Sequence, residues 1–124
     1  MRDVRVLVVE DDLVLNMDVS STLEATGFSV MSVYSYPEAI DALSKGQYLD
    51  ALLTDVDLGK GPDGFEVARQ ARRFYPALPV VFVSGTMGIY HAARRLQGSL
   101  FIAKPFHSAQ IIRALDQVIR REAA

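Results

Sequence analysis

The sequence contains no cysteine, and its 13 Lys and Arg residues nearly balance its 15 Asp and Glu residues. The lack of cysteine excludes a disulfide framework, a thiolate nucleophile and a cysteine-ligated zinc site. The net charge of −2 gives no electrostatic basis for binding nucleic acid. No apolar run approaches the ~20 residues of a membrane span, and the first residues do not form a signal peptide. We therefore expect a cytoplasmic protein that binds neither nucleic acid nor membranes.

The length and composition predict one folded domain over 1–124. Half of the 124 residues are hydrophobic and 23% are charged, which is typical of globular domains and argues against disorder. A chain of this length buries roughly two-thirds of its unfolded surface. It therefore needs neither a metal nor a disulfide in order to fold.

Short apolar runs alternate with amphipathic stretches along the whole chain. The spacing of Leu13, Met17, Val19, Ser20 and Leu23 is typical of a helix, and methionines such as Met17 are expected in or near the core. Five strands are predicted over 4–9, 28–34, 48–54, 79–83 and 100–103, and five helices over 13–23, 35–43, 65–74, 87–96 and 108–120. This alternation predicts an α/β fold with a parallel sheet and helices on both faces.

Polar side chains follow four of the predicted strands, where a parallel sheet of this kind places its ligands. They are Glu10, Asp11 and Asp12 after the first strand, Asp55 and Asp57 after the third, Ser84 and Thr86 after the fourth, and Lys104 after the fifth. Clustered carboxylates are suited to a hard cation such as Mg²⁺. A lysine and a hydroxyl opposite the metal would hold phosphoryl oxygens. The chain has no glycine-rich phosphate loop, so the site suits a lone phosphoryl group better than a nucleotide.

An acid after a strand can also cap the next helix, and Asp12 is predicted to be the N-cap of the first helix. For any single residue this plainer interpretation stays open. The agreement of four strand ends is what favours a shared site.

Five short segments, in this order, resemble the receiver domain of response regulators in two-component signalling, of the chemotaxis-regulator type. The segments are Val8-Val9-Glu10-Asp11-Asp12, Leu53-Thr54-Asp55, Asp63-Gly64, Val83-Ser84-Gly85 and Lys104-Pro105-Phe106. The resemblance covers nearly the whole chain. It implies a flavodoxin-like, doubly wound sheet of five parallel strands in the order 2-1-3-4-5, with five helices.

The resemblance also implies the chemistry of the site. Asp55 would accept a phosphoryl group from a sensor histidine kinase or a phosphotransfer protein. Asp11 and Asp55 would bind Mg²⁺ directly and Glu10 through water, and the backbone carbonyl of Asp57 would complete the protein ligands. The domain would be a phosphoacceptor that assists its own Mg²⁺-dependent phosphotransfer and dephosphorylation, rather than an enzyme.

The remaining implied roles are to bind the phosphoryl oxygens and to change conformation when Asp55 is phosphorylated. Ser84 and Lys104 would hold phosphoryl oxygens, and the Lys104-Pro105 bond would be cis. Ser84 and Phe101 would change position on phosphorylation. The resemblance then implies a changed surface over 87–96, 100–103 and 108–120, which could also form a homodimer. The downstream partner is not encoded in any motif.

The sequence departs from the common receiver pattern around Asp55 and Ser84. The spacing from Asp55 to Asp63 is about one residue longer than usual, and that from Ser84 to Lys104 about two shorter. Asp57 adds a carboxylate after the acceptor, and we expect Asp57 and Thr86 to tune the lifetime of the phosphoryl group. The plainer alternative for Asp57 is a solvated loop acid.

Two other classes of function stay open on the residues alone. Asp55 and Asp57 form the Asp-x-Asp pair of Mg²⁺-dependent phosphohydrolases of the haloacid-dehalogenase type, but those carry it on the first strand and have longer chains. A phosphorylation-independent receiver-like binding module is the second alternative. The intact set of acids, hydroxyl and lysine argues against it.

Overall fold

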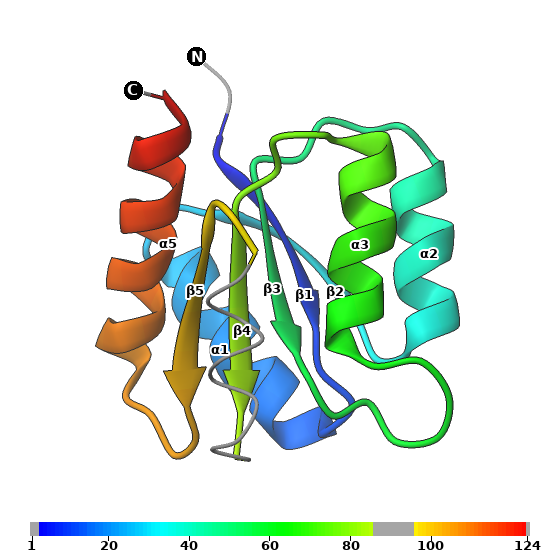
Figure 1. The fold of residues 1–124 in the computed structure, drawn as a ribbon. Helices are drawn as coiled ribbons and strands as arrows, with labels where there is room; N and C mark the ends of the chain where they lie inside the picture. The colour runs from blue at the N-terminus through cyan, green and yellow to red at the C-terminus, as the bar shows by residue number, and fades with distance from the viewer. Residues whose placement is uncertain (1–2, 86–95, 124) are drawn as a thin grey trace.

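A computed structural model describes residues 3–85 and 96–123 (Figure 1). The strands are β1 (Arg5–Val9), β2 (Ser29–Val33), β3 (Ala51–Asp55), β4 (Val80–Ser84) and β5 (Ser99–Ala103). The helices within the described residues are α1 (Leu13–Ala25), α2 (Tyr36–Ser44), α3 (Gly64–Phe74) and α5 (Ser108–Ala123). Among these residues, none of the helices is long and apolar enough to cross a bilayer. The predicted helix over 87–96 falls almost entirely outside the described residues, as does Thr86.

The five strands form one parallel sheet in the order β2-β1-β3-β4-β5, which confirms the predicted order. Within the described residues, the predicted strands and helices are confirmed to within three residues at their ends. The largest differences are at β3, which begins at Ala51 rather than at Tyr48, and at α5, which ends at Ala123 rather than at Arg120. The segment before β3 instead contacts Arg5, the first residue of β1. The Arg5 guanidinium lies 5.4 Å from the ring centre of Tyr48, and the Arg5 N–H donates to the Asp50 carboxylate.

Two apolar cores lie on the two faces of the sheet. Leu7, Leu52 and Phe82 belong to the core under α2 and α3, whereas Val6 and Leu53 belong to the core under α1 and α5. Neighbouring strand residues thus point into opposite cores. This arrangement explains why β3 and β4 are apolar up to the polar residues at their carboxyl ends, because both of their faces are buried.

Side-chain caps determine where three helices begin. The carboxylate of Asp12 accepts a hydrogen bond from the Leu15 N–H, which confirms Asp12 as the N-cap of α1. Ser35 caps α2 through the N–H of Glu38, and Asp63 caps α3 through the N–H of Glu66. Of the three acids that follow β1, Asp12 therefore caps a helix, whereas Glu10 and Asp11 remain available for the site.

Helix α1 agrees with the predicted spacing only in part, because Val19, Ser20 and Leu23 are buried as the spacing indicates but other members of the set are not. Leu13, Val14 and Met17 are 62%, 77% and 65% exposed, so the expectation that Met17 lies in or near the core is wrong. Asn16 and Ser20 are buried in the same helix. The reason is that the carboxyl ends of β1 and β2 provide hydrogen-bond partners for these two polar side chains, as described below.

Candidate functional site

The register of the sheet brings the predicted site residues to one edge. Val9 of β1 pairs with Thr54 of β3, so that Glu10 comes level with Asp55. Asp55 and Ser84 are the last residues of β3 and β4, and Lys104 directly follows β5. The Lys104 N–H donates to the Ser84 carbonyl over 2.9 Å, which ties the ends of β4 and β5 together. The peptide bond from Lys104 to Pro105 is cis, as the resemblance implies.

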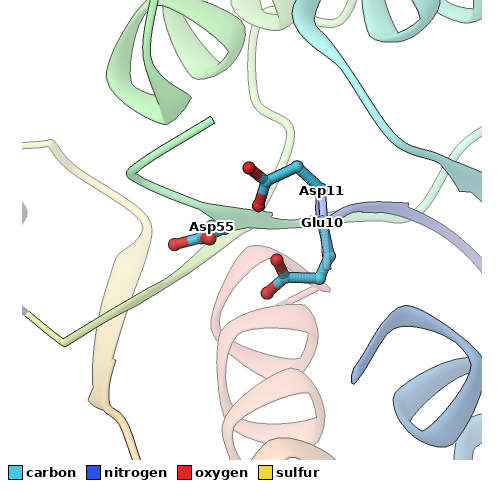
Figure 2. Close-up of side chains that lie close together, drawn as sticks. All are labelled: Glu10, Asp11 and Asp55. Carbon is cyan, nitrogen blue, oxygen red and sulfur yellow. The ribbon is translucent and has the colours of Figure 1, made fainter. Parts of the chain in front are cut away.

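Three carboxylates meet at this edge. Glu10, Asp11 and Asp55 each offer one oxygen, and these three oxygens lie within 4.8 Å of one another (Figure 2). Glu10 and Asp55 are only 6% and 5% exposed, whereas Asp11 is exposed and lies at the solvent side of the cluster. Three oxygen donors with no soft ligand among them are what a hard cation such as Mg²⁺ prefers. The acidic cluster could therefore hold a metal ion, and the exposed Asp11 makes the cluster accessible from solvent.

Lys104 joins the two buried acids. Its Nζ lies 3.1 Å from Oδ2 of Asp55 and 3.1 Å from Oε1 of Glu10, and its side chain is 26% exposed. The ammonium group thus supplies one positive charge for two buried carboxylates. The described structure brings Glu10, Asp11, Asp55 and Lys104 together, as the sequence predicts.

Burial shifts the protonation of this group. Burial raises the pKa of Glu10 to about 7, and the charge of Asp55 adds to the shift, while hydrogen bonds from the Asp12 N–H and from Lys104 oppose it. Burial also raises the pKa of Asp55, against the charge of Lys104. Burial by itself would lower the pKa of Lys104, but the hydrogen bond to Glu10 and the charge of Asp55 raise it above 10.5. The pair of acids therefore favours an added proton or cation.

Backbone N–H groups orient both buried carboxylates. The Asp57 N–H donates to Oδ1 of Asp55 over 3.2 Å, and the Asp12 N–H donates to Oε2 of Glu10 over 3.0 Å. One oxygen of each acid is therefore held by backbone, and the other faces Lys104. This arrangement holds both carboxylates in place around the ammonium group.

The other predicted site residues differ from one another in exposure and in contacts. Asp57 is exposed, and its Oδ1 accepts a hydrogen bond from the Gly59 N–H, so its side chain braces its own loop. Within residues 3–85 and 96–123, Asp57 is not part of the three-acid cluster. Ser84 is 1% exposed, and Phe101 is partly buried and packs against the core under α2 and α3. The predicted roles of the Asp57 carbonyl, Ser84, Phe101 and Thr86 stay predictions.

Gly64 has a structural role in the site. Its place in the Asp63-Gly64 segment of the sequence does not predict this role. A Cβ at Gly64 would lie 2.2 Å from the carbonyl oxygen of Asp55 and 2.9 Å from Cα of Val56. The Gly64 N–H donates to the Val56 carbonyl over 2.8 Å. The first turn of α3 therefore rests directly on the backbone of Asp55, and only a residue without a side chain fits there.

Known proteins are similar to this chain in sequence or in fold. The response regulator CtrA of Brucella ovis is 32% identical over 121 residues, which are 94% of this chain and 50% of that protein. The chain thus spans about half the length of the curated relatives that it matches. The crystal structure of a response regulator receiver protein from Sinorhizobium medicae superposes with a TM-score of 0.90, at 36% identity and with 98% of both chains covered.

A further solved structure is the receiver domain of the hybrid histidine kinase CckA, with a TM-score of 0.80 and 26% identity over 93% of this chain and 98% of that one. The sequence model of the response regulator receiver domain matches residues 6–116. Proteins of this family are typically phosphoacceptors rather than enzymes, and they work with histidine kinases. With its fold, its acidic cluster and this match, the chain belongs to the response regulator receiver domain family.

Proposed function

We propose that residues 1–124 act as one receiver domain, which accepts a phosphoryl group on Asp55 from a phosphohistidine of a sensor histidine kinase or phosphotransfer protein. The observation that supports this most is the position of the Asp55 carboxylate. It lies at the carboxyl edge of the sheet, beside the Lys104 ammonium and two further acids. A carboxylate nucleophile needs positive charge next to it, because the incoming phosphoryl group is also negative.

In the proposed transfer, an oxygen of Asp55 forms a bond to phosphorus as the phosphorus–nitrogen bond of the donor breaks. The electron pair of the broken bond stays on the imidazole nitrogen of the donor. Lys104, now 3.1 Å from Asp55, would turn its ammonium toward the phosphoryl oxygens. The Ser84 hydroxyl would donate to another of these oxygens, because Ser84 ends the neighbouring strand.

The residues present fit Mg²⁺ as the cofactor. Asp11 and Asp55 would bind it directly and Glu10 through water, with the carbonyl of Asp57 as a further ligand. When bound, Mg²⁺ supplies positive charge that offsets the repulsion between the carboxylates and the phosphoryl group. The charges of Glu10 and Asp55 are only partly matched by Lys104, which is the electrostatic reason for a cation here.

The proposed output is a change of surface. The phosphoryl group carries a charge of about −1.5 to −2, in place of the single negative charge of the Asp55 carboxylate at the end of β3. Ser84 would move toward the phosphoryl group, and Phe101 would take up the space that opens. The output surface that the resemblance predicts over 87–96, β5 and α5 would then change for a downstream protein, or for a second copy of the chain.

The test is phosphorylation by a small donor. Incubation with acetyl phosphate and Mg²⁺ is expected to add one phosphoryl group to the wild-type protein, measured by intact mass. Asp55→Asn should show no adduct, and Asp57→Asn, a matched change two residues away and outside the acidic cluster, should keep it. Following the adduct after donor removal, in Asp57→Asn and Thr86→Ala, tests the proposed tuning of its lifetime.

A folded wild-type protein that binds Mg²⁺ but forms no adduct would contradict this function. That outcome would instead favour the phosphorylation-independent binding module. Repeated turnover of a phosphate ester, without a lasting adduct, would favour a phosphohydrolase.

A surface beside the acidic cluster is suited to the histidine-bearing donor. Leu13, Val14 and Met17 are exposed on the first turns of α1, which begins two residues after Asp11. Exposed apolar side chains that lie together are typical of protein contacts. A donor histidine that reaches Asp55 must cover the surface next to it, so we propose that these three side chains contact the donor protein.

Val14→Asp and Met17→Asp are expected to slow transfer from a phosphorylated histidine kinase that labels the wild type by about tenfold, because one buried apolar contact contributes ~1–2 kcal/mol. Labelling by acetyl phosphate should be unchanged, since this donor needs no docking surface. Phe74→Asp is the matched control, because Phe74 is 48% exposed at the end of α3 away from the site. Equal slowing with both donors would show instead that the α1 changes disturb the site itself.

A further inference from the structure

Asn16 is a fully buried polar residue in a helix that exposes the apolar side chains of Leu13, Val14 and Met17. Its relative exposure is 0%, and it lies on α1, one turn after the acidic residues at the end of β1. A buried amide must find hydrogen-bond partners, because an unpaired one costs about 1–3 kcal/mol. Its partners therefore show what the residue does in the fold.

The Asn16 amide group bonds to two strand ends at once. Its Nδ2 donates to the carbonyl oxygens of Glu10 and Val33, each over 3.0 Å. Its Oδ1 accepts from the Ser20 hydroxyl over 3.1 Å, and the Ser20 hydroxyl lies 2.7 Å from that of Ser32. Both N–H donors of the amide are used, and both go to the carboxyl ends of β1 and β2.

The contact with Glu10 bears directly on the acidic cluster. The peptide unit is planar, so a hydrogen bond to the Glu10 carbonyl also fixes the orientation of the Asp11 N–H and Cα. The Glu10 N–H in turn donates to the Val33 carbonyl over 3.2 Å, so this carbonyl is shared with Asn16. The peptide plane that separates the Glu10 and Asp11 side chains is therefore held by one buried amide.

We propose that Asn16 is a positioning residue, which holds the peptide between Glu10 and Asp11 so that their carboxylates are spaced for a small cation. The inference rests on the proposed Mg²⁺ site but not on phosphotransfer. Asn16 does not touch the cation in this arrangement; it acts through the backbone of the two acids. The proposal thus extends the site to a residue on the buried side of α1.

Ion selectivity separates positioning from a merely structural role. Mg²⁺ needs nearly ideal octahedral geometry, whereas Ca²⁺ accepts variable geometry and more ligands. If Asn16 sets the spacing of the acids, Asn16→Ala should weaken Mg²⁺ binding by about 10- to 100-fold, as is typical when an outer partner of a metal ligand is lost. Ca²⁺ binding should weaken several-fold less, because the charges of the cluster are unchanged.

The measurement is calorimetric titration of each ion, at a temperature where circular dichroism shows the variant to be folded. Ser20→Ala is the matched control, since it removes the hydrogen bond to Asn16 Oδ1 but leaves the Glu10 contact in place. It should leave the ratio of the Mg²⁺ and Ca²⁺ affinities near that of the wild type. Asn16→Thr keeps one donor and part of the volume, and it serves as the second variant if Asn16→Ala does not fold.

An equal loss of affinity for both ions, an unchanged Mg²⁺ affinity in the Asn16 variants, or the same selectivity change in Ser20→Ala would overturn the inference. Failure of the wild type to bind Mg²⁺ would instead contradict the proposed metal site itself. The two failures are therefore distinguishable in one series of titrations.

Discussion

Replacing Lys104 with methionine is expected to destabilise the folded protein by about 3–5 kcal/mol near pH 8, and by much less near pH 5. Lys104 supplies the ammonium between Glu10 and Asp55, at 3.1 Å from each. Removing it leaves two nearly buried carboxylates without their cation, and unpaired buried charges are strongly destabilising. Methionine has a similar length, so the lost charge rather than a lost side chain dominates the effect.

The pH dependence follows from the direction of the pKa shifts. Burial raises the pKa of Glu10 to about 7 and raises that of Asp55, so both acids bind protons more tightly in the folded protein than in the unfolded chain. Their contribution to stability is therefore greatest below about pH 4 and is lost as the pH rises through 7. Near pH 5, below the raised pKa of Glu10, the acids bind protons in the variant and depend less on the lysine, which is why the effect of Lys104→Met shrinks in acid.

Urea unfolding of the metal-free protein at the two pH values measures this effect. Lys45→Met is the matched control, because Lys45 forms an ion pair with Asp41 at 3.4 Å on the surface, where both side chains are largely exposed. Such pairs contribute about 0.3–0.5 kcal/mol, so the control should change little at either pH. If Lys104→Met were equally destabilising at both pH values, the loss would come from packing rather than from unpaired charge.

Gly64→Ala is expected to reduce stability by about 3 kcal/mol and to slow phosphorylation of Asp55 by about 100-fold. The added Cβ would lie 2.2 Å from the Asp55 carbonyl oxygen and 2.9 Å from the Asp55 carbonyl carbon. These atoms are backbone, and they cannot turn aside as a flexible side chain would. Either α3 or the end of β3 must shift, and a misplacement of about 1 Å at a reacting group can reduce a rate 100-fold.

The measurement combines urea unfolding with the rate of labelling by acetyl phosphate. Gly85→Ala is the matched control, because Gly85 follows Ser84 at the same edge and a Cβ there meets nothing within 4 Å. The control should fold with nearly wild-type stability. A Gly64→Ala protein that is less stable but labels at the wild-type rate would show that α3 moves and that Asp55 stays in place.

Local patterns in the sequence account for the strands and for the gathering of the site residues. Apolar runs and breakers identified the strands, and the polar residues at the strand ends identified Glu10, Asp11, Asp55 and Lys104 as one group. This prediction works because a parallel sheet brings the carboxyl ends of its strands to one edge, whatever the details of packing. The order of the strands and the cis bond came from the resemblance and are confirmed.

The orientation of α1 could not be predicted in the same way. Its apolar residues lie on more than one side of the helix, so the spacing that includes Val19, Ser20 and Leu23 identifies the buried face only in part. The expectation that Met17 lies inside is wrong, and the spacing does not single out Asn16. The buried face was decided by the carbonyl groups of Glu10 and Val33, which give an amide the partners that a methionine could not use.

By itself, the sequence determined which residues gather at the site, because strand ends and chemistry are local properties. Only the tertiary structure decided how they are held. It places one ammonium between two buried acids, rests the first turn of α3 on the Asp55 carbonyl, and ties the peptide after Glu10 to Asn16. The contacts of Lys104 join segments far apart in the chain, and the energies of all these contacts depend on burial and distance, which no local pattern of residues records.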